Sequence, residues 1–368
     1  MKKSIIPMVA LTALLAASCG SHEANVPTGP VVLEMSKNTG AQSSTPISVK
    51  DVTSIRLSGD NPEAFFKNAS ILDVAGDTVI MLENNPVASR LVMFSITDGR
   101  YLGQINHQGQ GPGEYTRIIG AFVDAGNQTI MLPDFHSPAV NVYSLAADTL
   151  VSVIEREFVP SVVDPIGSLA TCINVACPNP EGLDIVQYGS GYALIDSVSV
   201  PGFRGGNFST VWTTAGKDGV MMMGDTIYTL VPGELRPLAI ADRGSLTITP
   251  KTDEELMMKI LGSGESEIEV LKPYILIRNI MIDGEKMLLT SMHNARKTSD
   301  LYDLTTGSLI YRNSYETLSI PSSIVIEAGG KTIGVERLFA KDGVWYGLVS
   351  DDSATDDNTN STLVSFRL

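Results

Sequence analysis

The sequence predicts an all-β fold and, within that class, a six-bladed β-propeller, with seven blades as the alternative count. Short apolar alternations separated by Gly, Asp and Asn run through most of the chain from Ile47 onward, as is typical of strands joined by tight turns. One segment, Asp253 to Leu261, has the spacing of a short helix. A hairpin pattern recurs along the chain, and such recurrence favours a ring of similar sheets.

The recurring unit consists of alternating apolar residues, an aromatic residue and then a polar turn. It occurs at Leu91 to Ile96, Val140 to Leu145, Thr226 to Leu230, Asp300 to Leu304 and Leu363 to Phe366. The 85 residues from Tyr143 to Tyr228 leave room for one more unit, which we place at Gln187 to Val200. A β-sandwich or two smaller β domains would also show alternation, but neither has a reason to reuse one aromatic hairpin five times.

The N-terminus has the pattern of an export signal. Lys2 and Lys3 precede an apolar run from Ile5 to Ala17, and small residues lead to Cys19. The run is shorter than the roughly 20 residues that a transmembrane helix needs. We therefore expect residues 1–18 to be removed.

The segment after the signal is predicted to be a flexible tether. Residues 19–46 are rich in Ser, Thr, Pro, Gly and Asn, with one short strand at Val31 to Leu33. Residues 47–368 then form the propeller domain, which we expect to be monomeric.

The charge balance excludes one class of partner. The chain has 26 basic and 41 acidic residues, and loss of Lys2 and Lys3 with the signal takes its net charge from −15 to −17. Such a chain would be repelled by nucleic acid, and an anionic membrane surface would repel it too.

Two further cysteines, Cys172 and Cys177, lie in the middle of the chain. In an oxidising compartment they could close a small disulfide loop, and the alternative is two free thiols. Their spacing does not match a zinc site, because no second Cys or His pair accompanies them. We expect no metal and no cofactor.

A glycine-rich segment, Gly103 to Tyr115, contains Gly109, Gly111, Pro112, Gly113 and Glu114. The three glycines permit positive φ and the proline fixes its own φ, so we interpret the segment as a structural turn between blades. Glu114 is expected to cap backbone N–H groups there. A phosphate-binding loop is disfavoured, because no Lys-Ser/Thr follows and no helix begins at this point.

This segment resembles the G-x-I-x-x-x-G-x-G-P-G-E-[YF] signature of six-bladed, TolB-like or NHL-like propeller lipoproteins of Bacteroides-type bacteria. A second segment, Gly224 to Tyr228 followed by Leu235 to Leu238, looks like the D-T-[IV]-Y … L-x-P hairpin of the same proteins. Cys19, after Leu14 to Ser18, resembles their lipobox, in which the cysteine is acylated and becomes the new N-terminus. The resemblance implies a propeller attached by lipid to the outer membrane, on its periplasmic or its outer side, and implies no reaction.

Candidate ligand-binding residues are few. The best group for a central funnel is Asp134, His136, His293 and Asn294, which come from different repeats. A second candidate is Arg204, which lies between two aromatic residues in the glycine-rich loop Phe203 to Phe208. No G-x-S-x-G nucleophile elbow is present.

The functional hypothesis is a non-enzymatic binding or scaffold module of the cell envelope, with a peptide, a glycan or a partner protein as its ligand. The alternative is a propeller hydrolase or lyase with a metal in the central funnel. A purely structural subunit of an envelope complex is the third interpretation.

Overall fold

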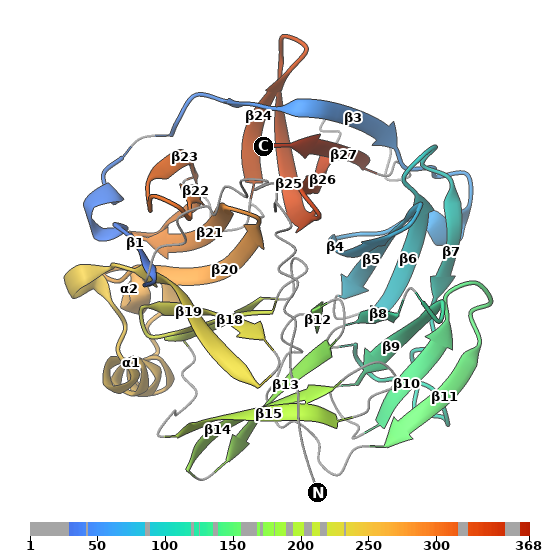
Figure 1. Cartoon of the computed structure of the whole chain (residues 1–368), viewed down its shortest axis with the longest axis horizontal. Coiled ribbons are helices and arrows are strands. Elements are labelled where there is room, and N and C mark those ends of the chain that lie inside the picture. The colour runs from blue at the N-terminus through green and yellow to red at the C-terminus, as the bar shows by residue number, and fades with distance from the viewer. Residues whose placement is uncertain are drawn as a thin grey trace, which may run out of the picture.

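The described strands form six sheets arranged in a ring, shown in Figure 1. The computed structural model describes residues 29–41, 43–84, 89–118, 121–124, 126–134, 139–155, 168–169, 172–179, 181–188, 194–201, 208–213, 219–231, 233–315, 323–349 and 361–368. We number the sheets as blades 1 to 6 in chain order. The inner strands of neighbouring blades touch, as β16 does with β20, β20 with β25, and β25 with β4. The predicted all-β propeller is confirmed.

Blades 1 to 3 each contain four strands in chain order from the inside outward. Blade 1 consists of β4 (Ala69–Ala75), β5 (Thr78–Asn84), β6 (Ser89–Ser95) and β7 (Tyr101–Ile105). Blade 2 consists of β8 (Phe122–Asp124), β9 (Thr129–Pro133), β10 (Ala139–Ser144) and β11 (Leu150–Glu155). Blade 3 consists of β12 (Ser168–Leu169), β13 (Cys172–Asn179), β14 (Gly182–Tyr188) and β15 (Leu194–Pro201).

Blades 4 and 6 take additional strands from the N-terminal part of the chain. Blade 4 consists of β16 (Thr210–Thr213), β17 (Val220–Met223), β18 (Thr226–Val231) and β19 (Glu234–Ala241), with β1 (Val31–Leu33) outside β19. Blade 5 consists of β20 (Leu276–Asp283), β21 (Lys286–His293), β22 (Arg296–Asp303) and β23 (Leu309–Tyr315). Blade 6 consists of β25 (Lys331–Lys341), β26 (Val344–Val349), β27 (Thr362–Arg367) and β3 (Lys50–Arg56), with β24 (Ser323–Ala328) and β2 (Ile47–Ser48) added on the side of β25.

The ring is closed by joining the two ends of the described chain. The strand β3 pairs antiparallel with β27, so that Ile55 lies opposite Leu363 and Ser54 opposite Val364. Blade 6 therefore contains its own late strands and one early strand. This pairing fixes the first and last parts of the propeller to each other.

The aromatic residues of the predicted repeat all lie on the third strand of a blade. The register with the fourth strand shifts beside Phe94, Tyr143 and Tyr302, in blades 1, 2 and 5. In blade 3 the same shift occurs beside Tyr188. The unit that we placed at Gln187 to Val200 is thus part of a complete blade, and the count of six is confirmed.

The core lies between blades rather than inside one of them. Buried apolar side chains from neighbouring sheets meet in separate clusters, for example Ile80 with Ile130, Ile185 with Met221, Val220 with Ile280, Met281 with Val335, and Phe339 with Val79. These clusters join five pairs of neighbouring blades, and packing between neighbours is the usual source of stability in repeat architectures.

Helices occupy the connection between blades 4 and 5. The helix α1 (Pro250–Ser263) covers the predicted helical segment, and α2 (Glu267–Leu271) follows it. Thr249 caps the N-terminus of α1, and Gly264 ends it with a φ of 70°. Asp253 of α1 accepts hydrogen bonds from the backbone N–H groups of Phe208 and Ser209, which fixes the helix to the start of β16. Short 3-10 turns occur at Ser36–Asn38 (η1), Pro62–Ala64 (η2) and Gly244–Leu246 (η4).

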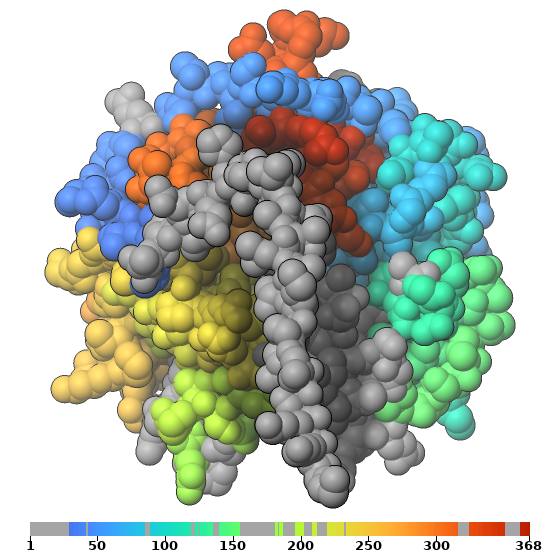
Figure 2. Space-filling view, viewed as in Figure 1, coloured from blue at the N-terminus to red at the C-terminus, as the bar shows by residue number. Residues whose placement is uncertain are grey.

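The prediction of a flexible tether is wrong for its described second half. Residues 31–41 and 43–48, which we call the strap, run along the outside of blades 4, 5 and 6 (Figures 1 and 2). The strand β1 pairs with β19, Ser44 N–H donates to the Arg312 carbonyl at 2.8 Å, and β2 pairs with β24. Leu33 and Met35 are buried. Composition indicated a tether, but these side chains and backbone groups find partners on distant strands.

Three other predictions concern residues 1–28 or the cysteines. The export signal and Cys19 lie outside the described residues. No helix in the described part of the chain combines the length and apolar character that crossing a membrane requires.

Cys172 and Cys177 both lie on β13, where five steps along an extended strand separate their Cα atoms by roughly 16 Å. A disulfide needs Cα atoms within about 7 Å, so this strand does not fit a bond between them.

Candidate functional site

The glycine-rich segment forms a closed turn between blades 1 and 2. Gly109 N–H donates to the Tyr115 carbonyl at 2.9 Å, and Glu114 Oε2 accepts from Gly111 N–H at 2.7 Å. This is the kind of contact that the sequence predicts for Glu114. Of the three glycines, Gly113 alone has a positive φ, of 76°. At Gly109 a Cβ atom would lie 1.9 Å from Glu114 Oε2, so a side chain there would displace the Glu114 carboxylate from its present position.

Blade 2 holds this turn in place. Tyr143 Oη donates to the Gly113 carbonyl, and Asn141 Nδ2 donates to the Glu114 carbonyl at 2.9 Å. His107 stacks on the Tyr143 ring and its Nε2 lies 2.9 Å from Asp148 Oδ1. The segment therefore fastens two blades together.

The predicted funnel group is not brought together by the described residues. Asp134 belongs to blade 2 and His293 to blade 5, with two other blades between them in either direction around the ring. The buried Asp134 carboxylate accepts hydrogen bonds from Thr116 N–H, Thr116 Oγ1 and Arg117 N–H, so it orders the chain that enters blade 2. His136 and Arg204 lie outside the described residues.

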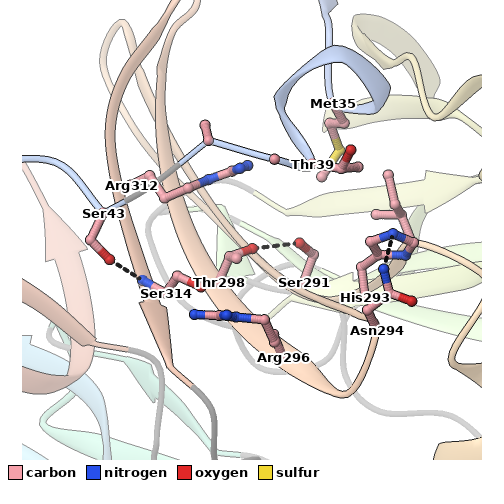
Figure 3. A pocket seen from close by; sticks show the side chains of 13 residues that line it. Met35, Thr39, Ser43, Ser291, His293, Asn294, Arg296, Thr298, Arg312 and Ser314 are labelled. Carbon is pink, nitrogen blue, oxygen red and sulfur yellow. Dashed lines mark hydrogen bonds between the residues drawn. The ribbon is translucent and has the colours of Figure 1, made fainter.

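His293 lines a pocket on the outside of the ring, between the strap and blade 5 (Figure 3). The pocket has a volume of about 470 Å³, within the range of small-molecule sites. The strap contributes Met35, Thr39, Gly40, Ala41 and Ser43, and the opposite wall is formed by Ile275, Ser291, His293, Asn294, Arg296, Thr298, Arg312 and Ser314. We call this the strap pocket.

Both ring nitrogens of His293 make hydrogen bonds in the pocket. Its Nδ1 lies 3.2 Å from the Tyr274 carbonyl, which can only accept, so Nδ1 carries the proton. Nε2 then accepts from Asn294 Nδ2 at 3.0 Å. The turn between β21 and β22 therefore holds the imidazole ring at the pocket wall.

The hydroxyl groups of the pocket come from both walls. Ser291 Oγ and Thr298 Oγ1, on the paired strands β21 and β22, lie 2.9 Å apart. On the strap side, Ser43 Oγ accepts from Ser314 N–H at 3.0 Å. Each of these oxygens has further hydrogen-bonding capacity, because a hydroxyl has one donor and two acceptor sites.

A buried ion pair supports the wall next to the strap. Arg312 donates from Nε and Nη2 to the two oxygens of Asp300, at 2.7 and 2.6 Å, and from Nη1 to the Asn38 carbonyl of the strap. The Asp300 side chain is 0% exposed and that of Arg312 is 5% exposed. Burial raises the pKa of the Asp300 carboxyl, and the Arg312 guanidinium opposes this. The pair fixes strap and blade 5 to each other.

Sequence reasoning singled out His293 and Asn294, but for a central funnel, and it did not predict this pocket or its other lining residues. Arg312 and Ser314 are brought to Asn38, Ser43 and Ser44 across 268 to 274 positions of sequence. No local sequence pattern predicts such a contact, because the strap residues have the composition of a linker.

Comparisons with known proteins define the class of protein to which this chain is similar. Residues 36–166 match a family described as a 6-bladed beta-propeller, DUF5128. A Bacteroides fragilis protein, provisionally described as exported, is 15% identical, with a TM-score of 0.63 over 92% of this chain and 99% of that one. This likeness shows the fold. The chain is a β-propeller, and its structure and this match agree on six blades.

Two further solved structures are less similar. A member of the DUF4221 family from Bacteroides vulgatus is 10% identical, with a TM-score of 0.47 over 87% of this chain and 97% of that one. BamB from Moraxella catarrhalis is 11% identical, with a TM-score of 0.38 over 88% and 99%. No curated protein matches the chain.

Proposed function

We propose that the chain is a non-enzymatic binding module of the bacterial envelope that takes a polar ligand, a glycan or a peptide segment, into the strap pocket. The pocket itself carries this proposal. It combines a volume of about 470 Å³ with hydroxyl, amide, imidazole and guanidinium groups that converge from two walls. A few placed polar groups in a concave site are what fix the orientation of a small ligand.

The chemistry of the pocket supports binding more than catalysis. The Ser291 and Thr298 hydroxyls pair with each other, the Ser43 hydroxyl accepts from a backbone N–H, and His293 already uses both ring nitrogens in hydrogen bonds. Among the described residues, no group of three or more His, Cys, Asp or Glu side chains is placed to hold a metal ion. The described part of the chain thus offers no observation that favours the metal-dependent hydrolase or lyase.

The location in the envelope is part of the same proposal. The N-terminal sequence has the pattern of an export signal followed by Cys19, and the similar Bacteroides fragilis structure is provisionally described as exported. We propose that lipid on Cys19 attaches the protein to the outer membrane. The strap then begins only about a dozen residues after the anchor.

The test is a binding screen with two matched variants of the purified full chain. Thr39→Trp places a large side chain in the mouth of the strap pocket from an exposed position, and Ser152→Trp makes the same change on β11 of blade 2. Against a panel of oligosaccharides and short peptides, we expect ligands of the wild type to be lost by Thr39→Trp and kept by Ser152→Trp. A panel in which every bound ligand survives Thr39→Trp would refute the site.

The anchor is checked in cells by fractionation. Cys19→Ser removes the thiol that would carry the acyl chains. Because those chains supply the durable attachment in this proposal, the variant should move from the membrane fraction to the soluble fraction. Retention of the variant on the membrane would show that the attachment lies elsewhere.

A further inference from the structure

An arginine on the inner strand of blade 6 has an unusual backbone conformation. Arg337 lies at a bulge of β25, between Glu336, which is opposite Leu348, and Phe339, which is opposite Tyr346. Its φ is 52°, in the left-handed region that glycine and asparagine adopt far more easily than a long side chain does. Backbone strain of this kind, and bulges as well, are concentrated at functional sites. The side chain of Arg337 is therefore a candidate for a function.

The charge of Arg337 is not matched by an ion pair. The residue is partly buried. Among the described residues its guanidinium makes one side-chain hydrogen bond, from Nη2 to Asn68 Oδ1 at 3.0 Å, and no ion pair. Burial lowers the pKa of Arg337, and the neighbouring Glu336 opposes this. A partly buried cation is ordinarily paired with an anion, so this position has room for a negative partner from outside the chain.

Asn68 extends the set of hydrogen-bond donors around Arg337. It directly precedes β4 of blade 1, and its φ of 57° is left-handed too. Because a guanidinium can only donate, the bond from Arg337 fixes the amide with Oδ1 toward Arg337 and leaves the Nδ2 hydrogens available. The Nε and Nη1 groups of Arg337 likewise have no partner among the described residues. All of this remaining capacity is for donation, which suits a ligand that only accepts.

We infer that Arg337 and Asn68 form an oxyanion site at the junction of blades 6 and 1, for a ligand that carries a carboxylate or a phosphate group. Either group accepts hydrogen bonds and supplies a negative charge, and the planar fork of arginine can bind either through two parallel bonds. The inner strands β25 and β4 touch each other in the ring (Figure 1). The site is separate from the strap pocket, which the strap and blade 5 form.

The test is thermal unfolding of the purified full chain in phosphate and in malonate, each compared with chloride at equal ionic strength. An anion that binds only the folded state raises Tm, and at about 50 mM we expect a gain of about 1–3 °C from at least one of the two. Arg337→Gln should lose this gain. Because general salt effects on hydration act on both proteins, the difference between them measures the site. A gain from phosphate alone assigns a phosphate group, and a gain from malonate alone assigns a carboxylate.

Three further variants separate binding from a structural role. Arg337→Lys should restore part of the gain, since lysine keeps the charge without the planar fork. Arg236→Gln, which removes an exposed arginine paired with Glu234, should keep the whole gain. Asn68→Asp supplies a carboxylate of the same shape beside Arg337, so it should raise Tm in chloride and abolish the gain from either anion.

The site is overturned if the gain is equal in the wild type and in Arg337→Gln, or absent from both. Arg337 would then be a structural contact between blades 6 and 1, recognisable by a lower Tm of Arg337→Gln in chloride. If Arg337→Gln does not fold, Asn68→Asp decides the same question. A gain that persists in Asn68→Asp would also overturn the site, because the ion pair within that variant leaves no charge for the ligand.

Discussion

Blades 2 and 5 lie on opposite sides of the ring and finish their outer edges differently (Figure 1). In blade 5 the strap covers β23 with three hydrogen bonds. Ser44 N–H donates to the Arg312 carbonyl, and the backbone N–H groups of Arg312 and Ser314 donate to the hydroxyl oxygens of Ser44 and Ser43. In blade 2, β11 is the last strand of its sheet, and Leu150, Val151 and Val153 are 42%, 56% and 43% exposed. An uncovered edge strand is a place where other chains can pair, and the strap removes that hazard at blade 5.

The same register positions show what the strap changes. In blade 2 Asn141 lies opposite Val153, and in blade 5 the corresponding pair is Asp300 opposite Arg312. The ionic pair is buried under the strap, whereas Val153 faces solvent. The same position of the repeat thus holds an ion pair in blade 5, where the strap covers it, and a neutral pair in blade 2, where the edge faces solvent. We attribute the difference to the presence of the strap.

The largest expected difference between the two edges comes from Arg312→Ala compared with Val153→Ala. Removing Arg312 leaves a buried carboxylate without its cation and frees the Asn38 carbonyl of the strap, at a cost of about 3–5 kcal/mol. Val153→Ala, on the exposed edge, should change stability by only about 0.5 kcal/mol. Urea unfolding of both variants at pH 7 measures the difference.

The pH dependence of Arg312→Ala has a defined sign. Burial raises the pKa of Asp300, and the variant removes the cation that opposes this. A carboxyl with a raised folded pKa contributes most stability below its unfolded value, about 3.9, and loses it as pH rises through the folded value. The deficit of the variant should therefore be larger at pH 8 than at pH 5. Equal costs for Arg312→Ala and Val153→Ala would show that the strap does not bury this pair in solution.

The second contrast concerns the turn between the third and fourth strands. In blade 5 this turn has Gly307 at a φ of 73°, and in blade 2 Asp148 takes the same place at 47°. A Cβ atom on Gly307 would lie 2.2 Å from the Val32 carbonyl oxygen of the strap. Gly307→Ala should cost about 2–4 kcal/mol, from left-handed strain and from the collision with β1.

The matched change in blade 2 is Asp148→Gly, which relieves strain and loses a partly exposed contact with His107. It should alter stability by about 1 kcal/mol or less. Limited proteolysis between residues 29 and 48 would show whether Gly307→Ala releases the strap while Asp148→Gly does not. Resistance of both variants to cleavage would contradict a steric role for Gly307.

These contrasts also explain how far the sequence could predict the molecule. The repeat was visible because each aromatic residue and its turn are neighbours in sequence, as Tyr302 and Gly307 are. The strap was missed because its buried anchors, Leu33 and Met35, are two apolar residues within a polar segment. Its partners are backbone groups of β19, β23 and β24, and the composition of the strap carries no information about backbone groups of distant strands.

The candidate site was predictable only in part for the same reason. His293 stood out as one of few histidines, yet Arg296 and Arg312 look like ordinary residues of alternating strands. Asp134 stood out as an acid after a strand, and the structure uses it to order Thr116 and Arg117. A pocket between a strand and a crossing segment follows from topology, which hairpin patterns do not encode.

The smallest expected difference between the two blades is a pH effect at the first residue of the same turn. Asp303 Oδ1 in blade 5 accepts from the backbone N–H groups of Thr305 and Thr306, and Ser144 Oγ in blade 2 accepts from Ala147 N–H. The Thr305 hydroxyl, which donates to the carboxylate, lowers the pKa of Asp303, helped by Lys286. A lowered folded pKa gives stability that is present above about pH 3.9 and lost as pH falls through the folded value.

Asp303→Asn should therefore cost about 1 kcal/mol at pH 7 and progressively less below pH 4, whereas Ser144→Ala should cost a similar amount with no such dependence. Thermal unfolding from pH 2 to pH 7 separates the two, and parallel curves for both variants would mean that charge on Asp303 adds nothing to the turn.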